Sequence, residues 1–246
     1  MNDFLKFLKI VLKINSFYYN RLLKLKRVYF YFNDKYRILS FLLTGRLKDF
    51  MNKTAKILSY IFDGSFISIP IFLVICLMIV ESKIAAVGWA LLCLLFGIII
   101  PYLYMYFLYK KKRINDMHVP RKEDRIKPLV VSCTSYIICF FMLYALEGPL
   151  FLKSIFAISI ISTIILTVIT YFWKISLHTS WITFIVITFN ILFGRWMLLL
   201  VPLIPVIGWA RVRIKKHTTI QVVLGAGIST VTTFFIYYNY GFINLF

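Results

Sequence analysis

Seven apolar segments follow one another through most of this 246-residue chain, and they constrain its fold more than any other feature. We place them at about 58–80, 84–109, 129–147, 151–172, 178–194, 196–210 and 218–239. A segment of about 20 apolar residues can cross a bilayer as a helix, and hydrocarbon admits only helices and closed barrels. Hydrophobic residues make up 61% of the sequence, above the roughly 45–50% of soluble domains. The sequence therefore predicts an all-α, polytopic membrane helical bundle of about six to seven transmembrane helices.

The fifth and sixth segments are shorter than a full crossing of roughly 20 residues. Pro202 and Pro205 lie in the sixth segment, and proline bends a helix because it removes a backbone donor and clashes with the preceding turn. Short or bent helices leave their ends recessed below the membrane surface. We therefore expect a pocket beside these two segments.

Residues 1–57 have a different pattern, in which lysines interrupt every apolar stretch. Lys6, Lys9 and Lys13 have helical spacing, and apolar residues fill the opposite face. This pattern is typical of a helix lying in the interface of an anionic membrane, although a solvated basic extension is the alternative. We divide the chain into a basic amphipathic interfacial segment, 1–57, and a transmembrane domain, 58–246.

Basic residues outnumber acidic ones by 29 to 9, which gives a formal net charge of +20. Such an excess indicates nucleic acid, anionic lipid or an anionic substrate as a partner. Nucleic acid is excluded because the chain has no soluble basic domain. If all seven segments cross, only Lys83, Lys153 and Arg195 lie on the less basic face. The positive-inside tendency makes the other face, with the N-terminus, cytoplasmic.

The four cysteines, Cys76, Cys93, Cys133 and Cys139, fall inside apolar segments and form no CxxC pair. We interpret them as small buried apolar residues. No disulfide, metal site or cofactor is predicted.

The stretch from Lys174 to Gln221 gathers the candidate reactive groups. Arg211 is followed by His217 after five residues, and Gln221 is one helical turn beyond His217. The Gln221 amide oxygen can accept a hydrogen bond from one ring nitrogen, which leaves the other free as a nucleophile. The first turn of the last apolar segment offers unpaired N–H groups and a positive dipole end, and both favour phosphate.

A second group begins the fifth apolar segment. Ser176 has the position of an N-cap, His178 follows it, and Lys174 can reach an anion at this helix end. Phosphoryl transfer through histidine needs one imidazole to attack phosphorus and another to protonate the departing oxygen. The pair His178 and His217 fits that requirement. Interfacial histidines that cap helices or meet lipid headgroups are the alternative for each residue alone.

The basic loop 110–128 contributes a third group, which includes His118, Arg121 and Arg125. A juxtamembrane basic loop without a ligand explains the same residues.

The order of these groups resembles the type-2 phosphatidic acid phosphatase family, which is related to bacterial acid phosphatases and vanadium haloperoxidases. The family motifs are K-x6-R-P, P-S-G-H and S-R-x5-H-x3-D. Ile175-Ser176-Leu177-His178 is similar to the second motif, and Ala210-Arg211 through His217 to Gln221 is similar to the third. Arg121 and Arg125 match the first motif loosely. The resemblance covers about 110–230.

The resemblance implies a helical bundle that hydrolyses a lipid phosphate or a polyprenyl diphosphate through a phosphohistidine, without a cofactor. It implies that His217 is the nucleophile, that His178 is the general acid, and that Gln221 orients His217. The implied phosphate ligands are Arg211, Arg121, Arg125, Lys174 and Ser176. Gln221 replaces the aspartate of the family, and a neutral amide stabilises an imidazolium less than a carboxylate does.

Two alternatives stay open. A protein of the same fold that binds or transports a lipid phosphate without turnover is favoured by Gln221. A membrane prenyltransferase is hinted at by Asn115-Asp116, but such enzymes need carboxylates in two loops to hold Mg²⁺, and the last acidic residue is Glu147.

Overall fold

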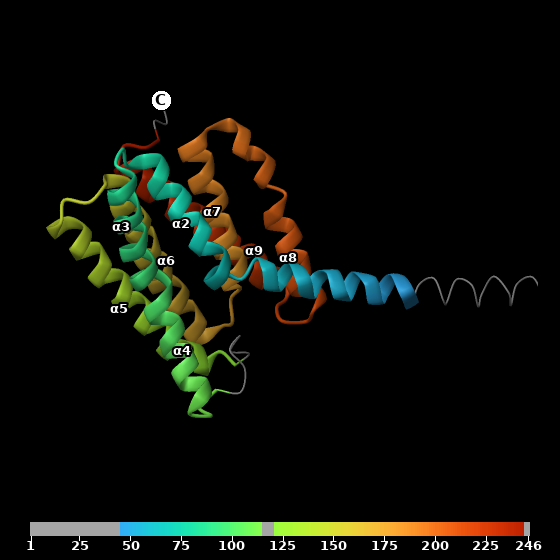
Figure 1. Ribbon diagram of the computed structural model, residues 1–246. Helices are drawn as coiled ribbons and strands as arrows, with labels where there is room; N and C mark the ends of the chain where they lie inside the picture. Colours follow the sequence, from blue (N-terminus) through green and yellow to red (C-terminus); the bar gives the residue numbers. More distant parts are fainter. Residues whose placement is uncertain (1–44, 115–120, 244–246) are drawn as a thin grey trace, which may run out of the picture. The chain divides into compact units, whose positions relative to one another are not determined.

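A computed structural model describes residues 45–114 and 121–243. The chain divides into two compact units, Met1–Lys53 and Thr54–Phe246. In the first unit the described residues, 45–53, are helical. Most of the predicted interfacial segment, residues 1–44, lies outside the described part of the chain. Helices joined by short turns and loops make up the described residues of the second unit, which contain no strand (Figure 1).

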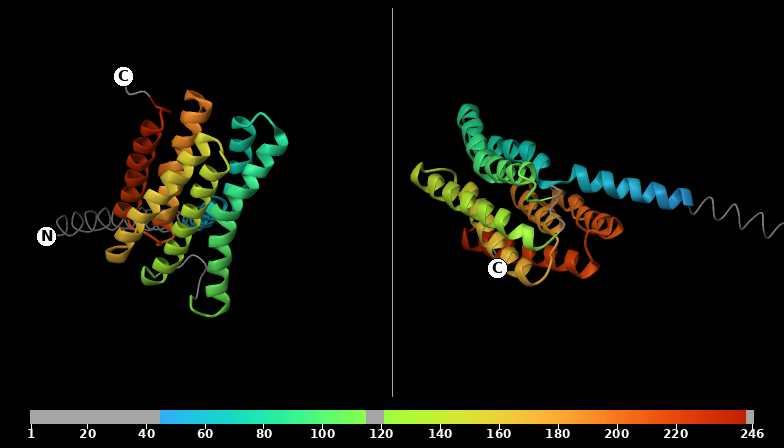
Figure 2. Two further views of the ribbon diagram at one scale, coloured as in Figure 1. Left: turned by 90° about the vertical axis from the view of Figure 1, so that its left-hand side faces the viewer. Right: turned by 90° about the horizontal axis from the view of Figure 1, so that it is seen from below.

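The second unit begins with helical residues 54–61. The elements that follow are α2 (Gly64–Ile79), α3 (Lys83–Leu94), a π-helical turn η1 (Leu95–Ile99), α4 (Ile100–Lys110), α5 (Glu123–Ala145), α6 (Leu150–Phe172), α7 (Leu177–Phe193), a 3-10 turn η2 (Arg195–Leu200), α8 (Leu203–Arg213) and α9 (Thr219–Asn239). Figure 2 shows α3, η1 and α4 as one long helix.

Five helical stretches are long and apolar enough to cross a membrane: Lys83–Lys110, Glu123–Ala145, Leu150–Phe172, Arg195–Arg213 and Thr219–Asn239. These five indicate an integral membrane protein, as predicted. The apolar helices Ile67–Ile79 and Leu177–Phe193 are shorter than this length. The described residues therefore support five spans and do not by themselves establish the predicted six to seven.

Three predicted helix boundaries are wrong. The segment 58–80 is not one helix, because the chain leaves helical geometry at Phe62 and Asp63 before α2 begins. The predicted helix 196–210 is a 3-10 turn and α8, separated at Val201 and Pro202, where proline interrupts the helical hydrogen bonds. Helix α5 begins six residues before the predicted 129, with Glu123 and Asp124 in its first turn, where carboxylates favour the helix dipole. This earlier start places Arg125 on a helix rather than in a loop.

Helix α5 packs along α6, and α7 packs along α9. The close approach of α7 and α9 depends on Gly225, because a Cβ there would stand 2.6 Å from the Ser176 carbonyl oxygen. The Ser176 amide donates to the Gln221 carbonyl oxygen at 3.3 Å, and the Thr179 hydroxyl donates to the Val222 carbonyl oxygen at 3.2 Å. These contacts hold the first residues of α7 and α9 side by side.

Candidate functional site

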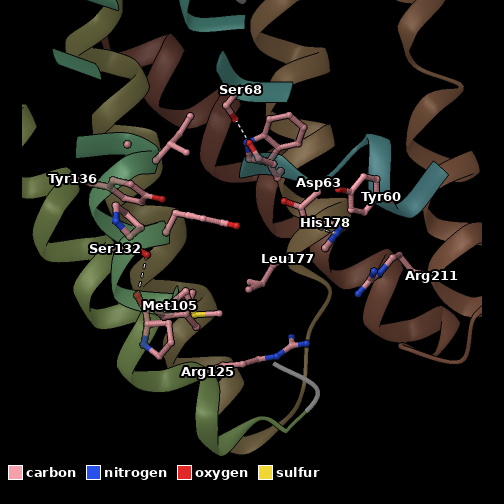
Figure 3. A pocket seen from close by; sticks show the side chains of 18 of the residues that line it. Tyr60, Asp63, Ser68, Met105, Arg125, Ser132, Tyr136, Leu177, His178 and Arg211 are labelled. Carbon is pink, nitrogen blue, oxygen red and sulfur yellow. Dashed lines mark hydrogen bonds and ion pairs between the residues drawn. The ribbon is translucent and has the colours of Figure 1, made fainter. Parts of the chain in front are cut away.

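A cavity of about 510 Å³ opens among the first residues of α2 and α7, the first part of α5, the last residues of α8, and residues of η1 and α4. We call it the polar cavity. Its polar lining comes chiefly from Asp63, Arg125, His178, Arg211 and His217. Figure 3 shows Arg125, His178 and Arg211 extending into the same space from different helices. Its size is typical of a small-molecule site.

Two buried guanidinium groups line the polar cavity. Arg125 is 6% exposed and Arg211 is 2% exposed. Arg125 donates to the Ile175 carbonyl oxygen at 3.1 Å, and Arg211 donates to the Ser59 hydroxyl oxygen at 2.6 Å. Each of these hydrogen bonds uses one of the five N–H donors of a guanidinium and fixes the direction of its fork. Two positive groups in a poorly hydrated space make an anion favourable there.

Lys174 joins the segments that carry the two histidines. Its ammonium donates to the Lys216 carbonyl oxygen at 2.8 Å, so the loop before α7 is tied to the loop before α9. Burial lowers the pKa of Lys174, and the nearby Arg125 and Arg211 charges lower it further. Lys174 therefore lies close enough to Arg125 and Arg211 for their positive charges to act on it. All three residues were predicted from the sequence as phosphate ligands.

His217 and Gln221 have the predicted relation. His217 Nδ1 lies 3.3 Å from Gln221 Oε1. The same oxygen accepts the Thr218 amide at 3.1 Å, which fixes the orientation of the Gln221 amide group. Because Oε1 is only an acceptor, Nδ1 must carry the proton. The other nitrogen, Nε2, is left with its lone pair.

Gln221 also completes a capping box with Thr218, the N-cap residue of α9, and this role was missed in the sequence reading. The Gln221 backbone N–H donates to the Thr218 hydroxyl oxygen at 3.4 Å. Two of the backbone donors expected to be open at this helix end are therefore already bonded. Phosphate binding here depends on the side chains more than on the α9 N-terminus.

His217 is neutral across the ordinary pH range. Its ring is 7% exposed. Burial lowers its pKa from 6.5 to about 3, with further lowering by Arg125, Arg211 and Lys174, while the Gln221 hydrogen bond acts in the opposite direction. A buried, uncharged imidazole with one free lone pair is suited to nucleophilic attack.

His178 lies beside a carboxylate. Its Nε2 is 3.4 Å from Asp63 Oδ2, and the two side chains are 15% and 19% exposed. This distance exceeds that of a good charge-assisted hydrogen bond, about 2.7–2.9 Å, as is common before a ligand binds. The carboxylate stabilises the protonated ring.

Two further predicted phosphate ligands, Ser176 and Arg121, differ in where the structure places them. Ser176 is the N-cap of α7, as predicted, but its hydroxyl makes no capping hydrogen bond. That oxygen is buried and has no hydrogen-bond partner among the described residues. Arg121 is exposed, and it is not among the residues that line the polar cavity. His118, Asn115 and Asp116 lie outside the described residues.

Asp63 and Ser59 were missed because they lie in the segment read as the first membrane helix. The dipeptide Asp63-Gly64 is a turn signal. A carboxylate inside an apolar segment also indicates a functional position. Together these two signals identify Asp63 from sequence.

No protein family model matches the chain, and no curated protein or solved structure is significantly similar to it.

Proposed function

We propose that this protein is a membrane phosphatase that hydrolyses a lipid phosphate or diphosphate through a phosphohistidine at His217. The observation that carries the proposal is the shared cavity: His178, Arg125 and the pair Arg211 and His217 line one space although they come from three separate parts of the chain. The resemblance of the sequence motifs to type-2 phosphatidic acid phosphatases agrees with this arrangement.

The bound phosphate is held by the cations. The guanidinium groups of Arg125 and Arg211 suit bidentate contacts with phosphate oxygens. Lys174 adds positive charge near them. The buried Ser176 hydroxyl supplies a further donor if the first turn of α7 shifts toward the ligand. Arg121, which is exposed, contributes to the approach of anionic lipid rather than to the site.

In the first step the lone pair of His217 Nε2 forms a bond to phosphorus, and the bond between phosphorus and the lipid oxygen breaks. The departing oxygen takes a proton from the protonated imidazole of His178. In the second step neutral His178 accepts a proton from water, the water oxygen bonds to phosphorus, and the N–P bond breaks. Inorganic phosphate leaves, and both histidines return to their first states.

Asp63 is a positioning residue in this scheme. It touches His178 rather than the reacting atoms. Its carboxylate holds the ring and favours the protonated form that the first step requires. Gln221 has the same relation to His217, but as a neutral amide it leaves the ring uncharged.

The test is phosphate release from lysophosphatidate and from a polyprenyl diphosphate by the purified full chain in nanodiscs. The proposal predicts release by the native protein, and a loss of at least about 100-fold in His217→Ala. Gly88→Leu is the matched control, because Gly88 is exposed on α3 and a Cβ there meets nothing within 4 Å. Equal release by native protein and His217→Ala contradicts the proposal.

A second candidate is a lipid-phosphate binding protein without turnover. Gln221 favours it, because the capping box gives this residue a structural reason to be glutamine. Tight binding of the same lipids with no phosphate release supports this candidate. We propose for both candidates that the site opens to the cytoplasmic face, since it lies among the most basic loops of the transmembrane domain. Labelling of a cysteine placed at Arg121 from outside intact cells contradicts that orientation.

A further inference from the structure

A second cavity adjoins the polar cavity and runs into the apolar part of the bundle. We call it the inner cavity; its volume is about 280 Å³. The two cavities share lining residues, among them Ser68, Gly97, Tyr136 and Trp181. Beyond these shared residues the inner cavity is lined by α2, α6, α7 and Ser229 of α9, with Phe72, Phe156 and Phe184 among the largest side chains.

The character of the lining changes between the two cavities. The charged side chains among the lining residues, Asp63, Arg125 and Arg211, all belong to the polar cavity and lie at helix ends. None of the described residues lining the inner cavity is charged. Two of the hydroxyls at the inner cavity are bonded to protein groups: Ser159 donates to the Ile155 carbonyl oxygen at 2.9 Å, and Ser162 pairs with Thr232 at 2.9 Å. Such a space favours hydrocarbon over water.

Gly97 lies where the two cavities meet. It belongs to the π-helical turn η1, a feature that often marks functional sites. The Ser135 hydroxyl donates to the Phe96 carbonyl oxygen at 2.6 Å and so stabilises this widened turn. A Cβ at Gly97 would meet Phe156 at 3.6 Å and Phe72 at 3.7 Å. A methyl group fits there, whereas a longer side chain extends between the two rings.

We infer that the inner cavity binds the single hydrocarbon chain of the ligand whose phosphate lies among Arg125, Arg211 and His217. This inference rests on the proposed function for its headgroup. An apolar cavity of about 150 Å³ holds benzene, so about 280 Å³ accommodates roughly a dozen carbon atoms. The site therefore favours one chain, and a second chain of a diacyl lipid remains in the bilayer.

The test uses dodecyl phosphonate with a diazirine on a carbon near the end of its chain. Its C–P bond resists hydrolysis, so labelling does not depend on turnover. The full chain in phosphatidylcholine nanodiscs is irradiated with the probe, digested and mapped by mass spectrometry. We expect adducts on Phe72, Phe156 or Phe184, and we expect the same diazirine on dodecanol, which lacks the phosphonate, to leave these residues at least fivefold less labelled.

Two variants sharpen the test. Gly97→Leu should reduce the inner-cavity adducts at least fivefold, and Gly88→Leu, which faces outward from α3, should leave them unchanged. Adducts confined to exposed residues such as Leu91 and Leu103 overturn the inference on the native chain, whatever the variants do. Inner-cavity adducts without phosphate release overturn hydrolysis but keep the chain site. Phosphate release without those adducts overturns the chain site but keeps hydrolysis.

Discussion

The protonation of His217 gives a prediction that follows from its burial among cations. In the folded chain its pKa is lowered to about 3, whereas the ring in the unfolded chain titrates near 6.5. The unfolded chain therefore binds the proton first as pH falls. This contribution to stability is intact above about pH 6.5 and is lost progressively between there and about pH 3.

The magnitude follows from this gap. At pH 5 the unfolded ring is protonated and the folded ring is not, which lowers the free energy of unfolding by about 2 kcal/mol relative to pH 7. His217→Gln should lose correspondingly less stability over the same range. A bound phosphate raises the pKa of His217, because its negative charge favours the protonated ring. One unit charge at about 4 Å contributes ~1 kcal/mol in water and ~4 kcal/mol at the effective dielectric constant near a protein surface. Two charges double this energy, so a dianion should raise the pKa of His217 by about two units or more.

The assay is nuclear magnetic resonance of the chain with ¹⁵N-labelled histidine, of which it has three. His217→Gln identifies the His217 signals. We expect them to report the Nδ1–H tautomer and to show no titration from pH 7.5 to 5, and we expect titration to enter this range when dodecyl phosphonate is added. A His217 ring that titrates near pH 6.5 without ligand, or that carries its proton on Nε2, refutes the reasoning.

Substitutions at Asp63, Gln221 and Gly225 test the supports of the site. Asp63→Asn should lower kcat for phosphate release about 10-fold to 100-fold with little change in lipid affinity, because it acts through the general acid; an affinity loss without a change in kcat contradicts this role. Gln221→Ala should destabilise the chain by about 1 kcal/mol through loss of the capping box, whereas Gln221→Glu should keep the cap and raise the pKa of His217, as read from the same resonance titration. Gly225→Ala should lower the free energy of unfolding by about 1–3 kcal/mol, because its Cβ would stand 2.6 Å from a carbonyl oxygen of α7, while Gly227→Ala, with open space at that position, should not; equal effects of the two contradict the close packing of α7 on α9.

The helical, membrane-embedded class of this chain could be predicted because lipid leaves the backbone so few options. The segments 84–109, 151–172 and 218–239 were placed within about two residues of their observed ends, since continuous apolar composition defines them directly. The break at Phe62 and Asp63 was not predicted, because Asp63 is the single charged residue of the otherwise largely apolar segment 58–80.

The pairing of His217 with Gln221 was predictable because it needs only helical spacing. The meeting of Arg125 with Arg211, and of Asp63 with His178, depends on how distant helices pack, and no local pattern encodes that packing. The capping role of Gln221 is predictable from the pattern Thr-x-x-Gln that begins at Thr218, and the same residue also has the helical spacing that pairs it with His217.

The central claim is that His217 becomes covalently phosphorylated, and rapid quenching of the reaction with ³²P-labelled lysophosphatidate tests it most directly. The account predicts a protein-bound label that is stable to base, labile to acid and located on His217. It also predicts that the label accumulates in His178→Ala when the leaving group needs no proton, as with p-nitrophenyl phosphate. Phosphate release with no labelled protein, or with the label on another residue, would contradict the account.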